Sequence, residues 1–254
     1  MNNCPPITLW CLHGAVGMAA DWQRFAVIMT ALGIDVRAVD LWKYLDSGPQ
    51  SLEEAAARLN VEASANSCKN ILVGYSLGGR IALHAILEKF QPWSAAVIIS
   101  AHPGMEDVAE KLTRKKIDSN WSVKCSDGDW KTFLLEWQDQ AILQSKGDQV
   151  IEWGNRELLQ SRRKAIARSF IEWSLGCQRN LRIDLPKIDI PLLFLTGERD
   201  QKFTELARTC VAKIPSARHQ IVDDCGHRVP WEKSQFFFHA VSDFIAGILP
   251  NPPC

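Results

Sequence analysis

One stretch of the chain reads Asn70-Ile71-Leu72-Val73-Gly74-Tyr75-Ser76-Leu77-Gly78-Gly79-Arg80-Ile81-Ala82-Leu83. Its centre has the pattern G-x-S-x-G, with an apolar, strand-like run before it and a helix-like run after it. A strand that turns this sharply into a helix leaves no room for β-carbons beside the serine, which explains the flanking glycines. The turn lifts the Ser76 hydroxyl above the sheet edge and places the Leu77 N–H where an oxyanion forms. The stretch therefore predicts a nucleophile elbow in a parallel α/β sheet.

A serine needs a base at neutral pH, and the chain offers both a histidine and an acid further on. Residues 190–197 read as a buried parallel strand, and Asp200 follows at its carboxyl end, where open α/β sheets hold their chemistry. Residues 218–222 read as the next strand, and the loop after it contains His227. The order Ser76, Asp200, His227 is that of the α/β-hydrolases. We expect these three residues to form a catalytic triad.

A loop near the amino terminus is expected to supply a fourth component of the catalytic site, in addition to the three triad residues. The strand-like residues 7–12 run into His13-Gly14-Ala15-Val16-Gly17. A His-Gly loop at this place commonly supplies the second N–H of an oxyanion hole, here that of Ala15 beside that of Leu77. His13 is expected to hold this loop.

Each of these residues also has a simpler interpretation. Gly74 and Gly78 can serve a tight turn alone, Asp200 can cap the helix that follows it, and His227 can be a solvated loop residue. Their joint occurrence, in this order and between these strands and helices, favours the catalytic interpretation.

Strand and helix signals alternate along most of the chain. Strands are expected at 7–12, 35–40, 70–75, 95–100, 190–196 and 218–222, and helices near 20–32, 51–64, 78–90, 203–213 and 234–249. Such alternation predicts a parallel sheet covered by helices on both faces. From about 105 to 185 the strand signal disappears and the spacing becomes helical. We expect an α/β-hydrolase core of residues 1–104 and 186–254, with 105–185 inserted as a helical cap that selects the substrate and excludes water.

Composition narrows the class of protein. A chain of 254 residues suits one α/β domain, and 29 Lys and Arg against 29 Asp and Glu argue against a nucleic-acid partner. No apolar stretch is long enough for a membrane span, and the start lacks the features of a signal peptide. Eight scattered cysteines without zinc-ligand spacing fit free thiols and no metal site. We expect a cytoplasmic protein, a monomer or a small homo-oligomer.

Three segments carry more than the general hydrolase pattern: Gly74-Tyr75-Ser76-Leu77-Gly78-Gly79-Arg80, His102-Pro103-Gly104 and Gly197-Glu198-Arg199-Asp200-Gln201-Lys202-Phe203. They are similar to segments of the 2-succinyl-6-hydroxy-2,4-cyclohexadiene-1-carboxylate synthases, which eliminate pyruvate in menaquinone and phylloquinone biosynthesis. The resemblance covers most of the chain. The last segment discriminates best, because a general hydrolase needs only its aspartate.

The resemblance implies a set of substrate-binding residues. Arg80, Arg114 and Arg162 would bind substrate carboxylates, and Tyr75 and Trp137 would form pocket walls. Guanidinium groups bind carboxylates in bidentate fashion and stay charged, which suits a small polycarboxylate substrate. Neither a metal nor an organic cofactor is implied.

The chain departs from the family in two places. After its histidine the family often continues with Asn-Ala-His and an Arg-Glu-Asn-Pro run, whereas this chain reads His227-Arg228-Val229-Pro230-Trp231-Glu232-Lys233. Ala15 and Val16 stand where an aromatic residue is frequent. These differences concern contacts at the pocket rim and not the triad.

In such a lyase Asp200 orients His227, which draws the proton from Ser76, and the Ser76 oxygen then abstracts a substrate proton. The same triad suits a serine hydrolase that forms an acyl-enzyme: an esterase, a thioesterase or a C–C bond hydrolase. The arginines weigh against this alternative. A catalytically inactive binding module of the same fold is a third interpretation, and the complete triad weighs against it. The quinone pathway that is served stays open.

Overall fold

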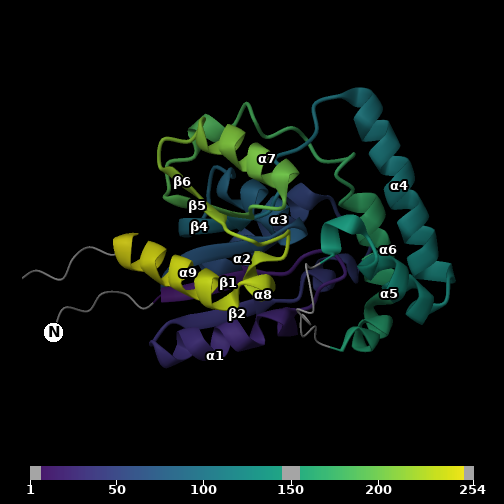
Figure 1. Ribbon diagram of the computed structural model, residues 1–254, viewed down its shortest axis with the longest axis horizontal. Coiled ribbons are helices and arrows are strands. Elements are labelled where there is room, and N and C mark those ends of the chain that lie inside the picture. The colour runs from purple at the N-terminus through teal and green to yellow at the C-terminus, as the bar shows by residue number, and fades with distance from the viewer. Residues whose placement is uncertain (1–6, 145–154, 249–254) are drawn as a thin grey trace, which may run out of the picture.

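The computed structural model describes residues 7–144 and 155–248 (Figure 1). Six strands form one parallel sheet in the order β2-β1-β3-β4-β5-β6. The strands are β1 (Ile7–Leu12), β2 (Asp35–Val39), β3 (Lys69–Tyr75), β4 (Trp93–Ile99), β5 (Leu192–Gly197) and β6 (Ala217–Val222). The predicted parallel α/β sheet is confirmed.

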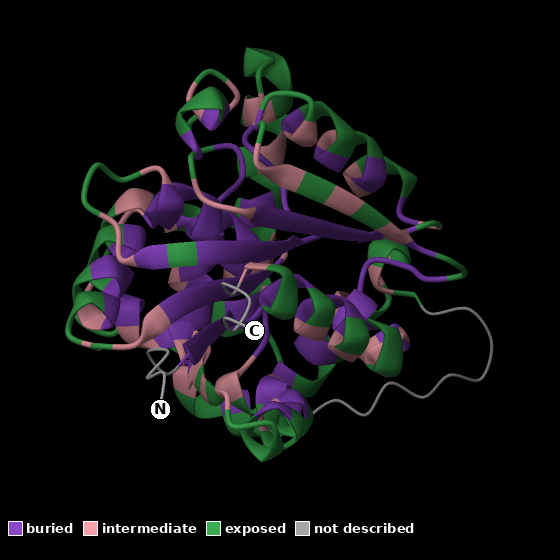
Figure 2. Ribbon diagram, turned by 90° about the vertical axis from the view of Figure 1, so that its left-hand side faces the viewer, coloured by how far each residue is buried: buried purple, intermediate pink, exposed green. Residues whose placement is uncertain are grey.

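Helices cover both faces of the sheet, because alternate side chains of each buried strand point to opposite faces. One face packs against α1 (Gln23–Ala31) and α9 (Ser234–Ile248). The other packs against α2 (Leu52–Ser64), α3 (Leu77–Ile86) and α7 (Gln201–Val211). Figure 2 shows the strands largely buried and the helices exposed on their outward sides. The sheet edge at the carboxyl ends of the strands is therefore the part of the core left for chemistry.

Some element bounds differ from the sequence prediction. The helix expected at 78–90 ends at Ile86, because its last turn tightens into i→i−3 bonds from Leu87 to His84 and from Glu88 to Ala85. The short helices η2 (Leu41–Leu45) and α8 (Val229–Glu232) were not predicted, since so few residues show no helical period. The last helix was expected to reach residue 249, which lies outside the described residues.

Between β4 and β5 the chain leaves the sheet, and the described part of this stretch is helical. It forms α4 (Val108–Asp127), α5 (Trp130–Gln138) and α6 (Arg163–Glu172), with short turns η3 (Ala141–Leu143) and η4 (Arg156–Arg162). These helices gather at the right of Figure 1, beside the sheet.

The inserted helices share an aromatic core. Trp121 of α4, Phe133 and Trp137 of α5 and Phe170 of α6 have ring centroids 5.1–6.5 Å apart. These contacts hold α5 where Trp137 can line a pocket. Of the helices in the described ranges, none combines the length and the apolar character that crossing a membrane requires.

Candidate active site

Ser76 lies in the sharp turn between β3 and α3. Its backbone angles are φ 51° and ψ −108°, a strained conformation for a residue with a β-carbon. Its N–H donates to the Ile99 carbonyl of β4 at 2.8 Å, which pins the turn to the sheet. A β-carbon on Gly74 would lie 2.6 Å from the Gly78 carbonyl oxygen, and one on Gly78 would lie 2.5 Å from that of Leu12. The two glycines are therefore required by lack of space.

The three predicted triad side chains meet at the carboxyl ends of their strands. His227 Nδ1 is 2.7 Å from Asp200 Oδ2, and His227 Nε2 is 3.2 Å from Ser76 Oγ. In the tautomer that satisfies both contacts, Nδ1 donates to the carboxylate and Nε2 accepts from the hydroxyl. Asp200 occupies the N-cap position of α7, but its carboxylate makes no cap bond. The carboxylate instead contacts His227.

Two aromatic rings fix the plane of the His227 imidazole. The Tyr75 ring centroid lies 5.5 Å from that of His227, and the Phe203 centroid lies 4.6 Å away. Phe203 is the last residue of the segment Gly197–Phe203, which resembles the family. Its physical role is to pack against the His227 ring.

A buried carboxylate holds the loop that carries His227. Glu232 Oε2 accepts from the Gly226 N–H at 2.7 Å, and Oε1 accepts from the Arg228 N–H at 3.0 Å. Arg199 Nη2 donates to the same carboxylate at 3.1 Å. The Glu232 side chain is only 1% exposed. Its two backbone donors flank His227, so this carboxylate sets the position of the imidazole.

The amino-terminal loop lies beside Ser76 and is held by His13. His13 Nδ1 donates to the Gly14 carbonyl at 2.8 Å, and Nε2 accepts from the Leu41 N–H at 3.1 Å. Burial lowers the pKa of His13, which favours the neutral ring that both bonds require. Val16 has φ 51°, a costly conformation for a β-branched residue. Strain of this kind is typical of functional loops.

Two backbone N–H groups are candidates for an oxyanion hole here. Leu77 is the first residue of α3, and the first N–H groups of a helix have no acceptor within it. Ala15 belongs to the strained loop beside the serine and lines the pocket.

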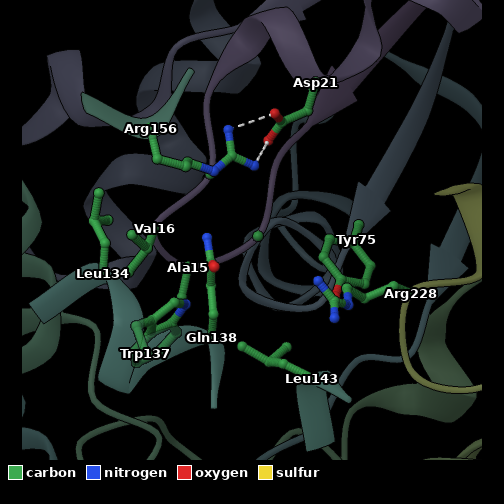
Figure 3. A pocket seen from close by; sticks show the side chains of 12 residues that line it. Ala15, Val16, Asp21, Tyr75, Leu134, Trp137, Gln138, Leu143, Arg156 and Arg228 are labelled. Atoms are coloured by element: carbon green, nitrogen blue, oxygen red, sulfur yellow. Dashed lines mark hydrogen bonds and ion pairs between the residues drawn. The ribbon is translucent and has the colours of Figure 1, made fainter. Parts of the chain in front are cut away.

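A pocket opens between this loop and the inserted helices (Figure 3). It is lined by Gly14, Ala15, Val16, Gly17, Asp21, Tyr75, Leu134, Trp137, Gln138, Leu143, Arg156 and Arg228. Tyr75 and Trp137, which were predicted as pocket walls, are both among these residues. Leu134, Trp137 and Leu143 of the inserted segment form one apolar side of the pocket, and Val16 and Tyr75 contribute apolar surface from the core.

The three predicted arginines lie outside this lining, and each contacts protein groups. Arg80 is buried, and its Nη2 donates to the Trp173 carbonyl at 2.7 Å while Nε donates to Gln178. Burial, together with the charge of Arg114, lowers the pKa of Arg80 to about 9.

Arg114 and Arg162 have carboxylate partners. Arg114 Nε lies 2.9 Å from both oxygens of Asp118, one helical turn along α4. Arg162 joins the inserted segment to the turn around η2, because it donates to Asp40 at 2.8 Å and to Asp46 at 2.9 Å. Both arginines thus already hold an anion of the protein.

Two other arginines line the pocket, and sequence reasoning did not single them out. Arg156 forms a bidentate pair with Asp21 at 2.6 and 2.9 Å, drawn as dashed lines in Figure 3. Arg228 follows His227 directly, and Figure 3 shows its guanidinium beside Tyr75. For Arg228, the only signal in the sequence was that the chain departs from the family at this position. For Arg156 there was no local signal, because its partner Asp21 lies 135 positions away in the chain.

Within residues 7–144 and 155–248, no group of three or more His, Cys, Asp or Glu side chains is placed to hold a metal ion.

A parallel sheet with a strained serine after β3, an acid after β5 and a histidine after β6 is the arrangement of the α/β hydrolases. The model of the alpha/beta hydrolase family matches residues 11–240. A relative from Citrobacter koseri, 2-succinyl-6-hydroxy-2,4-cyclohexadiene-1-carboxylate synthase, is 31% identical over 98% of this chain and 96% of its own. The chain belongs to the family of these synthases.

Solved structures agree on the fold. MenH from S. aureus superposes with a TM-score of 0.85 at 22% identity, covering 97% of this chain and 96% of its own. An esterase from Exiguobacterium antarcticum has a TM-score of 0.72 at 17% identity, covering 95% and 92% of the two chains. The fold is thus shared by enzymes of different chemistry, so function must be argued from the site.

Proposed function

We propose that this chain is a carbon-oxygen lyase that eliminates pyruvate from 2-succinyl-5-enolpyruvyl-6-hydroxy-3-cyclohexene-1-carboxylate. The product is 2-succinyl-6-hydroxy-2,4-cyclohexadiene-1-carboxylate. The observation that carries the proposal is the proton relay of Asp200, His227 and Ser76, with contacts of 2.7 and 3.2 Å, in a chain of this family. The proposed roles of individual residues follow from this geometry.

The relay serves as a base in this reaction. Asp200 orients His227, His227 Nε2 takes the hydroxyl proton of Ser76, and the Ser76 oxygen abstracts the ring proton next to the succinyl ketone. The electron pair moves onto the ketone oxygen, where the N–H groups of Ala15 and Leu77 stabilise the enolate. When the enolate collapses, the electron pair shifts through the ring double bond and breaks the carbon–oxygen bond to the enolpyruvyl group. The enolate of pyruvate leaves, and it takes up the proton that the relay gives back to become pyruvate. No covalent bond forms between Ser76 and the substrate.

The cap would hold and shield the substrate. Residues 105–185 are proposed as this cap, with Trp137 from its side and Tyr75 from the core as pocket walls. Arg80, Arg114 and Arg162 are proposed as partners of the substrate carboxylates, on the strength of the family resemblance. Because each already contacts protein groups, the substrate would have to share or replace those contacts.

One assay tests the reaction. The purified protein is given the enolpyruvyl substrate, and released pyruvate is followed by NADH oxidation in a coupled lactate dehydrogenase reaction. Release should require Ser76, so Ser76→Ala is the matched control. Intact mass spectrometry during turnover should find the unmodified protein mass. Accumulation of an acylated Ser76 with its natural substrate would instead support the serine hydrolase.

We also propose that the protein works in the cytoplasm as a monomer or small homo-oligomer. Light scattering after size-exclusion chromatography measures the latter directly. A single species, either a monomer or a small homo-oligomer, is expected.

A further inference from the structure

The segment Gly197–Phe203 has two charged residues, Glu198 and Arg199, to which the proton relay gives no role. Both stand between the last residue of β5 and Asp200, the acid of the triad. Their contacts run to the loop after β6, which carries His227. The two residues therefore lie where the acid and the base of the relay are brought together.

Backbone bonds join the turn that holds the acid to the loop that holds the base. The Glu198 N–H donates to the carbonyl at the end of β6 at 2.9 Å, and the Arg199 N–H donates to the Cys225 carbonyl at 2.9 Å. A β-carbon on Gly197 would overlap the carbonyl oxygens of Cys225 and Gly226. Because the two segments lie this close, a shift of the loop changes the distance between base and acid.

The side chains of both residues add to this junction. Glu198 Oε2 accepts from the Asp224 N–H at 2.9 Å. Arg199 Nη1 donates to the Asp224 carboxylate, and Nη2 donates to Glu232 Oε2 at 3.1 Å. One guanidinium thus bridges the part of the loop before His227 and the short helix α8 that follows it. A planar guanidinium suits this place, because its several N–H donors can hold two carboxylates at once.

The bridged loop contains features that need support. Asp224 has φ 44°, a sparsely populated conformation for a residue with a β-carbon. The Glu232 side chain is 1% exposed, and a buried carboxylate is costly unless charges and N–H donors compensate it. Arg199 supplies a cation in direct contact, and the charge of Arg228 also acts on this carboxylate. Lys233 lies 3.8 Å from Asp224, which is 61% exposed. Loss of the Arg199 guanidinium would therefore disturb the loop at both ends.

We propose that Arg199 is a positioning residue of the proton relay, which binds the loop on both sides of His227 and so holds the imidazole at Asp200. It acts mainly through the buried Glu232, because an exposed pair such as that with Asp224 contributes little. The inference rests on the proposed function for the reaction that is assayed. The distance between acid and base can be measured without any substrate.

The test compares Arg199→Met, which removes the guanidinium, with Arg199→Lys, which keeps a charge. Arg208→Gln is the matched control, since Arg208 is an exposed arginine of α7 that pairs with Glu205 at 3.4 Å. In pyruvate release, Arg199→Met should lower kcat roughly tenfold to a hundredfold, because a shift of about 1 Å in a catalytic group has an effect of this order. KM should stay within about threefold. Arg199→Lys should recover part of kcat, and Arg208→Gln should behave as the unmodified protein.

Crystal structures of the same variants measure the relay directly. His227 Nδ1 lies 2.7 Å from Asp200 Oδ2 in the unmodified chain. In Arg199→Met this distance should exceed about 3.5 Å, which breaks the hydrogen bond. Arg208→Gln should keep it. If Arg199→Met does not fold, Arg199→Lys decides by the same two measurements, with an expected fall in kcat of about threefold or more.

A double-mutant cycle with Glu232→Ala tests the route of the effect. If Arg199 acts through Glu232, the double variant Arg199→Met/Glu232→Ala should lose much less kcat than the product of the two single losses. Losses that multiply would show that the two side chains act independently, and would overturn the proposal.

The outcomes separate this proposal from the proposed function. If the unmodified protein releases no pyruvate, the proposed function fails, and a longer distance from His227 to Asp200 in Arg199→Met still supports the positioning role. If pyruvate is released and Arg199→Met loses thermal stability but keeps kcat within about twofold, Arg199 only stabilises the fold and the proposal is wrong. A rise in KM at constant kcat, or a fall in kcat with the relay unchanged in the crystal, would overturn it as well.

Discussion

The loop that carries His227 and the contact between cap and core are held by different kinds of bonds. At the loop, a Glu232 carboxylate that is 1% exposed accepts backbone N–H groups on both sides of the histidine. At the cap contact, Arg162 is 29% exposed and reaches carboxylates of Asp40 and Asp46 that are 44% and 49% exposed. Exposed pairs contribute about 0–1 kcal/mol, whereas buried, hydrogen-bonded carboxylates are costly to disturb.

The buried contacts of Glu232 suit a catalytic loop that must stay rigid, whereas the exposed ion pairs of Arg162 suit a binding region that can adjust. The relay needs fixed distances, and backbone donors around Glu232 supply them. If the inserted helices act as the proposed cap, they must admit a substrate and release two products, and weakly held ion pairs can be exchanged at small cost. One cap contact breaks this pattern: the Arg156 and Asp21 side chains are 9% and 2% exposed. That pair sits in the pocket wall, so it belongs with the rigid part of the site.

The largest effect is expected at the relay. Ser76→Ala should lower kcat roughly 10⁴-fold or more because it removes the oxygen that takes the substrate proton, and His227→Ala should do the same because it removes the base that activates that oxygen. Since the residues act as one unit, the double variant should lose little beyond either single change. Pyruvate release under saturating substrate measures this. Losses that multiply in the double variant would mean that the two residues act separately.

Acid should destabilise the protein through two buried histidines. Burial lowers the pKa of His84 and of His102 to about 3. The unfolded chain takes up these protons near pH 6.5, so the stability is fully present above that pH and falls as the pH drops towards 3. Each pKa unit corresponds to about 1.4 kcal/mol, so a few kcal/mol are at stake.

His102→Asn tests this, because an amide oxygen can still accept the bond from the Gly104 N–H that His102 Nδ1 accepts at 3.0 Å. Urea unfolding between pH 4 and 7 should show a flatter pH dependence in the variant. Equal slopes in the two proteins would argue against a neutral buried His102.

Two ion pairs of the inserted segment differ in burial, and we expect them to differ in their contribution to the free energy of unfolding. Asp21→Ala removes the carboxylate that the buried Arg156 contacts, and should lower the free energy of unfolding by about 3–5 kcal/mol. Asp40→Ala removes an exposed partner of Arg162 and should cost about 1 kcal/mol or less. Chemical denaturation of both variants gives the comparison. Similar losses would show that burial does not distinguish these contacts.

The support from Glu232 should have a moderate effect. Glu232→Ala leaves the N–H groups of Gly226 and Arg228 without their acceptor, a cost of about 1–3 kcal/mol for each buried group. Because the loop then shifts His227, kcat should fall while KM stays close to normal. Glu232→Gln retains an acceptor oxygen and should recover part of kcat. A variant that loses stability but keeps kcat would make Glu232 purely structural.

The smallest effect on stability is expected at Arg162. Arg162→Ala should change the melting temperature little, since its partners are exposed. If it also binds a substrate carboxylate, as the family resemblance implies, kcat/KM should fall roughly tenfold to a hundredfold. Arg114→Ala is the companion variant on α4. Unchanged kcat/KM in both would assign these arginines to surface ion pairs alone.

Local sterics and periodicity made much of the fold predictable. The elbow depends on the glycines around Ser76, and strands buried on both faces read as apolar runs. The strand prediction was therefore correct to within about two residues, as for 190–196 against Leu192–Gly197.

The features of the site that the sequence did not predict depend on contacts between residues far apart in the chain. Spacing places Arg80 one helical turn from Ser76, but Trp173 and Gln178 of the segment between β4 and β5 decide where its side chain points. The pair of Asp21 and Arg156 brings together two turns that no local pattern connects. Glu232 belongs to no motif, and its role arises only when its loop folds back on His227.

The distance along the chain between the serine and its base also has a consequence during synthesis. Ser76 and His227 are 151 positions apart. A ribosome that adds about 5–20 residues per second needs roughly 8–30 s to extend the chain by those 151 positions. The elbow needs only β3, α3 and the neighbouring strands, so it can form while the rest is still being made. A nascent chain therefore presents a serine without a base, and it stays chemically inert towards cell metabolites until the loop after β6 has emerged with His227.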